Sequence, residues 1–324
     1  MEIRKDWFTG RMCIVSEARG KRPHYFSEVI EQKTLCPFCP GNEKMTPKAE
    51  LITKIKENNI EVETGEEIWY SSEWNSRVFE NLYPAFDTQS DSPNYPYGYH
   101  YLIVETRSHN KDIDEYGENE IKSYIEALTS IKRKIEENKK VKYVSIFRNY
   151  GKEAGASVSH AHTQIIGSEL IPPNIEREMK IFSEKPEAMN LLINEARVQE
   201  RVIFEDDFIA FVPFAPISPF EFWITSRNKV VDITKDSEEM LKLFNVFSKL
   251  IFTMKKILGN VSYNYYFHIA PSSFSNFHWH MEVIPRTNIY AGYELGFGAT
   301  IITTKPETAA STIKQTLSSN KFLS

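Results

Sequence analysis

Residues 159–166 read SHAHTQII, with His160, His162 and Gln164 at alternate positions. On an extended strand, residues i and i+2 face the same side about 7 Å apart, so these three side chains are expected to line one surface. This spacing lets one histidine bind a metal while its neighbour faces a substrate. Taken alone, the pair also fits a simple metal site or buried polar residues. The preceding loop, 149–157 (NYGKEAGAS), is polar and interrupted by glycine, which suits backbone N–H groups that hold phosphate oxygens.

The strand ends a pattern that occurs twice along the chain. Residues 120–138 carry apolar side chains at helical spacing and precede a β-branched, aromatic stretch at 143–148. Residues 237–258 repeat the helical stripe, 263–270 repeat the strand, and His278 and His280 repeat the His-x-His. We therefore predict an α+β fold made of duplicated units, antiparallel sheets with helices packed on them, and not a chance likeness. The predicted division is 1–200 and 201–324.

Other segments are predicted from local signals. Residues 172–201 are expected to be helical with a break at Pro186, and the turn-rich stretch 87–98 is expected to be an exposed loop. The tail after residue 305 has the pattern of one weak helix at most.

Composition and charge exclude several classes of protein. The 324 residues suffice for two core-sized units, and 41% hydrophobic with 26% charged residues is typical of a globular chain. The net charge of −5 provides no basic field for nucleic acid or an anionic membrane, so neither is an expected partner. The first ten residues lack the apolar region of a signal peptide, and no segment has the pattern of a membrane span. Three cysteines suit a reducing compartment, and we expect a cytoplasmic protein.

Cys36 and Cys39 form a C-x-x-C pair that has three interpretations. Redox use is the weakest, because no predicted strand and long helix flank the pair as that chemistry requires. A structural zinc site needs two more ligands, for which His109 and His160 are the candidates. The pair alone leaves zinc and two structural cysteines equally open.

A second cluster involves His268, His278 and His280. Alternation places His278 and His280 on one face of a strand, and the preceding strand brings His268 near. Three imidazoles with one carboxylate, from Glu178 or Glu282, suit Zn²⁺ or Fe²⁺. The alternative is that these are ordinary core or surface histidines.

Residues 19–23 (RGKRP) place three cations in four residues, including Arg19 and Arg22. A solvated charged run is the usual explanation, and a phosphate clamp is the functional one, because guanidinium groups match phosphate geometry.

Together the motifs resemble the galactose-1-phosphate uridylyltransferase family, a two-repeat branch of the histidine-triad superfamily. The similar segments run from about residue 14 to 298. The most characteristic are CPFCPGN (36–42), FRNYGKEAGASVSHAHTQIIG (147–167) and FHWHMEVIP (277–285). The resemblance implies that the two predicted units are histidine-triad-like, the first with the C-x-x-C pair and the second with the second metal cluster.

The resemblance also implies a mechanism. His162 matches the histidine that attacks the α-phosphorus of a nucleotide sugar, forming a nucleotidyl-histidine and releasing hexose 1-phosphate before a second phosphorylated acceptor takes the nucleotide. Neutral imidazole is a good nucleophile near pH 7. Gln164 matches the residue that hydrogen-bonds the transferring phosphoryl group.

Binding residues are implied in the same way. The positions that match substrate contacts are Arg19, Arg22, Asn81, Asn149, Ser157, Tyr293 and Glu294. The positions that match a structural zinc site are Cys36, Cys39, His109 and His160. The positions that match a second metal site, for iron or a second zinc, are Glu178, His268, His278 and His280. A homodimer is implied as well.

Some positions depart from the family pattern. Asn81-Leu82-Tyr83 stands where Asn-Asp-Phe is usual, which removes a carboxylate near the nucleoside, and Thr163 replaces a glycine. Asn288 and Ile289 stand where lysine and phenylalanine are usual, and Thr300 replaces a glutamine. The transfer machinery is thus predicted more securely than the substrates.

The leading functional prediction is a nucleotidyltransferase of galactose metabolism that acts between UDP-glucose and galactose 1-phosphate. The alternative within the same chemistry is an ADP-glucose or dinucleoside-polyphosphate phosphorylase, in which inorganic phosphate is the acceptor. A metal-stabilised nucleotide-binding protein without turnover is the alternative from another class.

Overall fold

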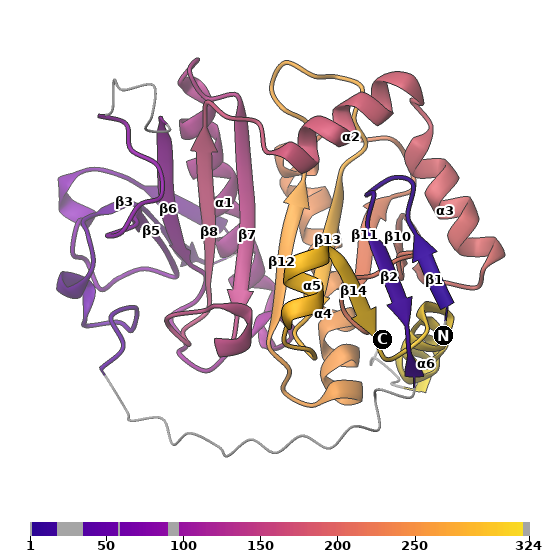
Figure 1. The fold of residues 1–324 in the computed structure, drawn as a ribbon. Coiled ribbons are helices and arrows are strands. Elements are labelled where there is room, and N and C mark those ends of the chain that lie inside the picture. The colour runs from indigo at the N-terminus through magenta and orange to yellow at the C-terminus, as the bar shows by residue number, and fades with distance from the viewer. Residues whose placement is uncertain (1, 18–34, 58, 90–96, 320–324) are drawn as a thin grey trace.

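A computed structural model describes residues 2–17, 35–57, 59–89 and 97–319. Its centre is an antiparallel sheet of eleven strands in the order β4-β3-β5-β6-β8-β7-β12-β13-β11-β10-β9 (Figure 1). The strands of the first half are β3 (Ala49–Lys56), β4 (Asn59–Glu63), β5 (Ser76–Glu80), β6 (Gly98–Val104), β7 (Tyr143–Tyr150) and β8 (His162–Ser168). Those of the second half are β9 (Val202–Glu205), β10 (Phe208–Phe211), β11 (Phe222–Ser226), β12 (Tyr263–His268) and β13 (His280–Pro285).

The strand order has the symmetry expected of a duplicated unit. Reading outward from the central β7–β12 pair gives β7, β8, β6, β5 on one side and β12, β13, β11, β10 on the other. If the four strands of each series are numbered along the chain, both series have the order third, fourth, second, first from the centre outward. The His-x-His strand lies second from the centre in each. The α+β prediction is therefore confirmed. The β7–β12 pairing joins both halves into one sheet, and the division at residue 200 stays a prediction.

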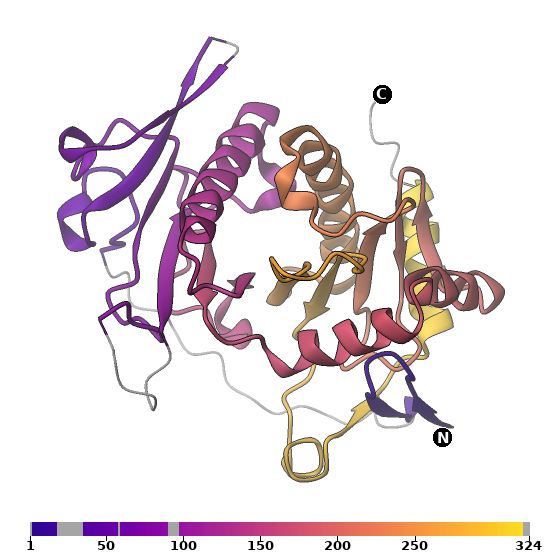
Figure 2. The same ribbon diagram turned by 90° about the horizontal axis from the view of Figure 1, so that it is seen from above.

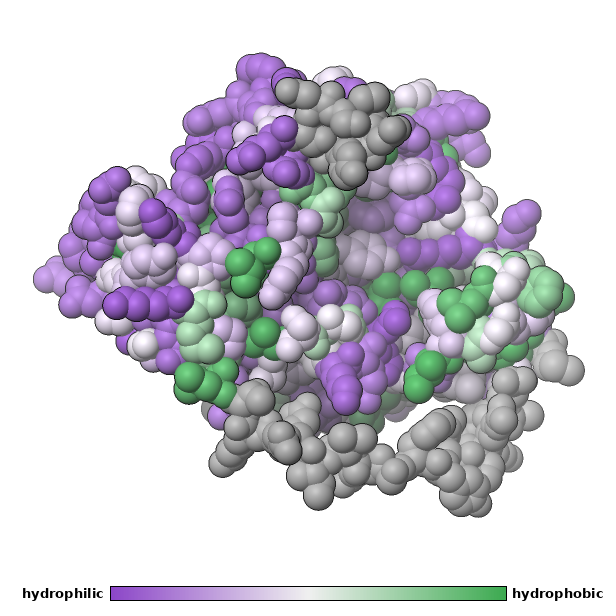
Figure 3. All heavy atoms as spheres, turned by 60° about the vertical axis from the view of Figure 1, so that its left-hand side comes forward, coloured by the Kyte–Doolittle hydropathy of each residue, from purple (hydrophilic) through white to green (hydrophobic). Residues whose placement is uncertain are grey.

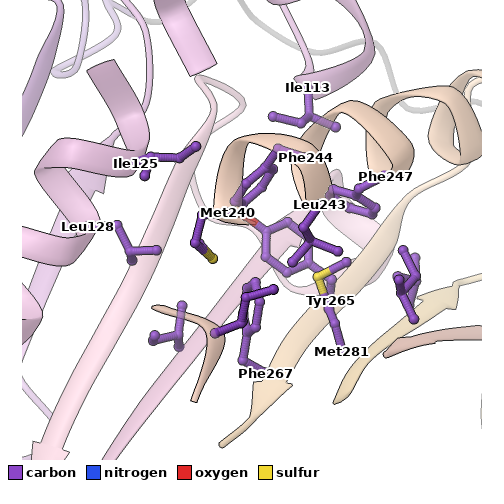
Figure 4. Packing of buried hydrophobic residues seen from close by; sticks show 14 of the residues in the cluster. Ile113, Ile125, Leu128, Met240, Leu243, Phe244, Phe247, Tyr265, Phe267 and Met281 are labelled. Atoms are coloured by element: carbon purple, nitrogen blue, oxygen red, sulfur yellow. The ribbon is translucent and has the colours of Figure 1, made fainter. Parts of the chain in front are cut away.

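Two long helices, α1 (Glu118–Glu137) and α4 (Ser237–Leu258), lie side by side on one face of the sheet (Figure 2). The Asp236 side chain accepts hydrogen bonds from the N–H groups of Glu238 and Glu239, which caps α4 at its first turn. The helices bury their apolar stripes against the strands, so Phe244 and Phe247 of α4 pack beside Tyr265 of the sheet (Figure 4). This core fixes the strands whose opposite face carries the site.

The opposite face of the sheet is crossed by α2 (Pro173–Glu184), which continues into α3 (Ala188–Val198) (Figure 2). Pro173 stands in the first turn of α2, where its missing N–H costs no helical hydrogen bond. The two helices are separated around Pro186, as the sequence predicts. Helix α2 brings Glu178 onto the sheet.

A smaller sheet unites both ends of the described chain. It contains β1 (Glu2–Lys5), β2 (Met12–Val15) and β14 (Ala299–Ile302), with β2 and β14 parallel. The flanking helices are α5 (Gly292–Phe297) and α6 (Pro306–Ser319). Arg4 of β1 forms two hydrogen bonds with the Glu307 carboxylate of α6, at 2.7 and 2.9 Å. The sequence patterns did not predict this sheet.

Among the described residues, no helix is both long and apolar enough to cross a membrane. The face drawn in Figure 3 is mostly hydrophilic and interrupted by a few separate hydrophobic groups. Three of the most exposed large apolar side chains lie in or beside α5: Ile289, Leu295 and Phe297, at 79%, 74% and 75% exposure.

Candidate active site and metal centres

Strand β8 presents the predicted catalytic residues. The strand begins at His162, two residues later than the sequence suggests for a strand holding both histidines, and His160 lies just before it. His162 and Gln164 alternate with Thr163 and therefore face one side of the sheet while Thr163 faces the other. His162 is buried and Gln164 is half-buried.

One hydrogen bond sets the state of the His162 ring. Its Nδ1 lies 2.9 Å from the carbonyl oxygen of His160, which can only accept, so Nδ1 carries the proton and Nε2 has a free lone pair. Burial lowers the pKa of His162, and nearby Arg148 also lowers it, although the hydrogen bond opposes both. The Phe38 ring packs edge-on against the imidazole at a centroid distance of 5.2 Å. The ring is therefore neutral and held from two sides.

Cys36, Cys39, His109 and His160 come together as the sequence predicts. One side-chain ligand atom from each lies within 4.8 Å of the others. The Cys39 Sγ is 3.3 Å from His109 Nδ1 and 3.6 Å from His160 Nδ1. His160 donates its Nε2–H to the carbonyl oxygen of Thr106 at 2.8 Å, which leaves Nδ1 free to face the sulfurs. A backbone carbonyl that orients a ligating imidazole in this way is typical of metal sites.

The protonation chemistry of this cluster fits a cation. Burial lowers the pKa of His160 to about 4, so its imidazole is neutral and available as a ligand. Burial and the neighbouring Cys36 raise the pKa of the Cys39 thiol to about 11 without an ion. A bound Zn²⁺ deprotonates its cysteine ligands, and two thiolates with two neutral imidazoles balance its charge. The donor set fits a divalent metal ion.

A second buried cluster contains Glu178, His268, His280 and Glu282, again with one ligand atom each within 4.8 Å. His268 and His280 are directly paired across β12 and β13, and His268 Nδ1 lies 2.7 Å from a Glu178 carboxylate oxygen. Four buried atoms here have no hydrogen-bond partner within the part of the chain that the structure describes: Glu178 Oε2, His280 Nδ1, His280 Nε2 and Glu282 Oε1. Such orphaned groups are costly unless something binds them, so these residues fit a metal ion.

Arg11 and Tyr266 hold the other oxygen of Glu282. Arg11 Nη2 and the Tyr266 hydroxyl each donate to Glu282 Oε2 at 2.7 Å, while Arg11 Nη1 donates to Glu221 at 2.9 Å. Oε1 of Glu282 is thereby left to face the histidines. Sequence reasoning missed Arg11, because its partners lie more than two hundred residues away.

With this geometry in view, comparisons with known proteins identify the family. The model of the galactose-1-phosphate uridyl transferase N-terminal domain matches residues 4–172. The chain belongs to the galactose-1-phosphate uridyl transferase family. A second model, for a domain of unknown function named DUF4921, matches residues 115–322. The family assignment makes the chain a nucleotidyltransferase.

Relatives cover nearly the whole chain. An ADP-glucose phosphorylase from Arabidopsis thaliana is 29% identical over 97% of this chain and 92% of its own. A galactose-1-phosphate uridylyltransferase from Thermotoga maritima is 27% identical over 98% of both chains. The crystal structure of an ADP-glucose phosphorylase from A. thaliana with bound ADP-glucose is similar with a TM-score of 0.80 at 26% identity, over 97% of this chain and 98% of that one.

Within this uridyl transferase family member, His278 stands apart from the second cluster. The resemblance implies His278 as a ligand, yet the buried group contains Glu282 in addition to Glu178, His268 and His280. His278 Nε2 lies 3.0 Å from the carbonyl oxygen of Ser226. Burial lowers the pKa of His278 to about 4, so its ring is neutral.

The predicted substrate contacts are distributed over several segments. Asn81 follows β5 and lies beside β6, and its amide nitrogen is 3.2 Å from His100 Nε2. Asn149 is the penultimate residue of β7 and accepts a hydrogen bond from Asn264 at 2.8 Å. Ser157 is exposed in the loop before β8.

Of the remaining predicted contacts, Tyr293 and Glu294 belong to α5, where Glu294 accepts a hydrogen bond from the Ala291 N–H at 3.0 Å. Arg19 and Arg22 lie outside the described residues.

The polar loop before β8 is shaped by glycine. Gly151 has a φ of 80°, and a Cβ there would meet Ser262 Oγ at 2.2 Å. A larger residue would therefore be strained and would collide with the neighbouring strand connection. The loop's position depends on this close approach.

Proposed function

We propose that this nucleotidyltransferase works through a covalent nucleotidyl-His162. The observation that supports it is the hydrogen bond from His162 Nδ1–H to the carbonyl of His160, because it leaves Nε2 unprotonated on the face shared with Gln164. A buried, neutral imidazole with a fixed tautomer is prepared for nucleophilic attack.

The proposed transfer has two displacements. His162 Nε2 attacks the α-phosphorus of a nucleoside diphosphate sugar, and the bond to the bridging oxygen breaks so that hexose 1-phosphate leaves. The imidazole ring then carries positive charge, which the His160 carbonyl dipole stabilises through Nδ1–H. A phosphate oxygen of the acceptor attacks the same phosphorus, the P–N bond breaks, and neutral His162 is restored.

Zinc is proposed for the cluster of Cys36, Cys39, His109 and His160, and zinc or iron for the second cluster. The first ion would supply a rigid anchor for His160, and through it for the carbonyl that holds His162. Phe38 lies between Cys36 and Cys39, and its ring packs against the His162 imidazole. The loop that carries the two cysteines would therefore also orient His162 directly.

Two donor and acceptor pairs are candidates. The first is UDP-glucose with galactose 1-phosphate, which the family assignment supports. The second is ADP-glucose with inorganic phosphate, which the similarity to ADP-glucose phosphorylase over 97% of the chain supports. Leu82, which is 60% exposed where the family usually has aspartate, also favours a nucleoside pocket that differs from the usual one.

The test is to incubate the protein with UDP-glucose or ADP-glucose without acceptor and to measure intact mass. A UMP adduct supports the first pair and an AMP adduct the second, and His162→Ala should form neither while retaining its fold and metals. UMP and AMP, which lack the leaving group, serve as control ligands. If His162→Ala transferred nucleotide at the parent rate, the nucleophile assignment would be wrong. Nucleotide binding by the parent without an adduct would indicate a non-catalytic protein.

We also propose a homodimer in which the second copy covers the apolar side chains of α5 and its preceding loop. Ile289, Leu295 and Phe297 are each at least 74% exposed, which is unusual for large apolar residues gathered in one short segment. Sedimentation of the parent and of a Leu295→Ser, Phe297→Ser variant tests this, since the variant should sediment as a monomer. A parent monomer at micromolar concentration would contradict the proposal.

A further inference from the structure

His100 is a buried histidine that the sequence motifs do not include. It lies on β6, and β6 pairs with β8 so that His100 is diagonal to Gln164 on the face of the sheet that carries His162. Side chains in diagonal positions of neighbouring strands are close enough to interact when they are long. The His100 Nε2 is 3.0 Å from Gln164 Oε1.

The tautomer of His100 follows from its other nitrogen. Nδ1 lies 3.2 Å from the backbone nitrogen of Ala85, and a backbone N–H can only donate. Nδ1 therefore accepts, and in the neutral ring the single proton is on Nε2. Burial lowers the pKa of His100, which keeps the ring neutral although the Gln164 hydrogen bond opposes this. Nε2–H then donates to Gln164 Oε1.

This hydrogen bond determines which end of the Gln164 carboxamide is free. With its oxygen held by His100, the amide nitrogen has no acceptor among the described residues and is left to donate. Without the bond, rotation of the side-chain amide by a half turn would exchange a donor for an acceptor, which repels a phosphoryl oxygen.

The side-chain carboxamide of Asn81 is oriented in the same way as that of Gln164, with its oxygen occupied. Its Oδ1 accepts the backbone N–H of Tyr83 at 2.9 Å, so its amide nitrogen is the end that points toward His100, at 3.2 Å from Nε2. With the His100 proton on Nε2, both nitrogens are donors and neither can accept, so the Asn81 amide nitrogen has no acceptor among the described residues. Two neighbouring carboxamides with their oxygens occupied form a site that presents donors to an anion.

We propose that His100 is a positioning residue that acts through Gln164, holding its carboxamide so that N–H donors face the transferring phosphoryl group. The inference rests on the proposed function, because it assigns His100 to the same transfer step. This role requires a neutral His100 ring with its proton on Nε2. The hydrogen bond from the Ala85 N–H to Nδ1 maintains that tautomer.

The experiment compares single-turnover adduct formation in four proteins: parent, His100→Phe, Gln164→Ala and the double variant. His100→Phe keeps a ring but loses the donor, and we expect adduct formation to slow by about tenfold, the effect of one misdirected hydrogen bond. His100→Gln is the matched control, since its amide nitrogen can donate from nearly the same place and should restore most of the rate. In the Gln164→Ala background, His100→Phe should have no further effect.

Three results would overturn the role of His100 alone. One is an equal slowing by His100→Phe in both backgrounds, which would indicate general loss of structure and not action through Gln164. A second is an Nδ1-protonated His100 ring by ¹⁵N NMR of the substrate-free protein. A third is adduct formation by His100→Phe at the same rate as by the parent. This result would exclude the role of His100 but leave the proposed function intact. A parent that forms no adduct with either nucleotide sugar overturns both.

Discussion

Thr163 donates a hydrogen bond of 2.7 Å from its hydroxyl to the Glu105 carboxylate, and both residues are fully buried. Glu105 also accepts from the Tyr116 hydroxyl and faces Arg148, at 2.9 and 3.0 Å. Strand β8 is thus held from the face opposite His162, because Thr163 alternates with His162 along the strand. The resemblance implies a glycine at this position, and in the present chain the Thr163 hydroxyl supplies the attachment.

Thr163→Val should destabilise the fold by ~1–3 kcal/mol, because it keeps the side-chain volume but removes a donor from a buried carboxylate. Burial raises the pKa of Glu105 despite the nearby Arg148, so this carboxylate depends on every donor it has. Urea unfolding measures the change. Thr163→Ser is the matched control and should lie close to the parent; equal losses in both variants would show that the methyl group, not the hydroxyl, matters.

The acid stability of the protein should depend on Asp112. Burial opposes ionisation of Asp112, but Arg148 at 2.6 Å and Lys255 at 2.7 Å outweigh it and lower the pKa. A carboxylate with a lowered pKa in the folded state stabilises the fold above its unfolded pKa of about 4, and this contribution disappears as the pH falls through the folded-state pKa. The stability lost in Asp112→Asn should therefore be largest at neutral pH and shrink below about pH 4.

Urea unfolding of parent and variant at several pH values tests this. The exposed Glu66→Gln serves as the control, and its difference from the parent should be small throughout. A difference for Asp112→Asn that grows as the solution becomes more acidic would contradict the expected sign.

Cys36→Ser should lower zinc content and thermal stability first, with activity falling as a consequence, because a structural metal site contributes folding free energy. Elemental analysis and thermal unfolding measure the two effects. Cys13→Ala is the matched control, because Cys13 is buried in a separate apolar cluster with Val15, Ala215 and Ile302 and is not among the grouped ligand residues. Full zinc retention by Cys36→Ser would argue against this ligand set.

Two residues, Glu282 and His278, are alternatives for the fourth ligand of the second metal site. The buried cluster contains Glu282, whereas the family resemblance implies His278. We expect Glu282→Gln to lose the second ion and His278→Ala to keep it, while both keep zinc at the cysteine cluster. Elemental analysis of the purified variants decides between them, and loss of the second ion from His278→Ala alone would restore the implied set.

Periodic elements were predicted well from the sequence because their signals are local. The stripe at 237–258 corresponds to helix α4, and the break near Pro186 separates α2 from α3. The tail helix α6, 14 residues long, is likewise where one was expected. These segments show their buried face directly in the spacing of their apolar residues.

Contacts between distant strands were harder to predict. The cysteine cluster was found because a C-x-x-C pair limits its remaining ligands to few histidines. His100 was missed because its importance depends on its register beside Gln164, and no spacing along the chain reveals a register. The sequence left Glu178 and Glu282 as alternative carboxylate ligands, because it does not show where α2, which carries Glu178, lies on the sheet.

The small sheet of β1, β2 and β14 also affects the order in which segments can fold during synthesis. Strands β1 and β2 are synthesised before the other described strands, yet β2 pairs with residues 299–302, and Arg11 contacts Glu221 and Glu282. Domains usually fold from the N-terminus as synthesis proceeds. Here β2 must wait until residues 299–302 have emerged, so strands made before the large sheet reach their places after most of its strands have been made.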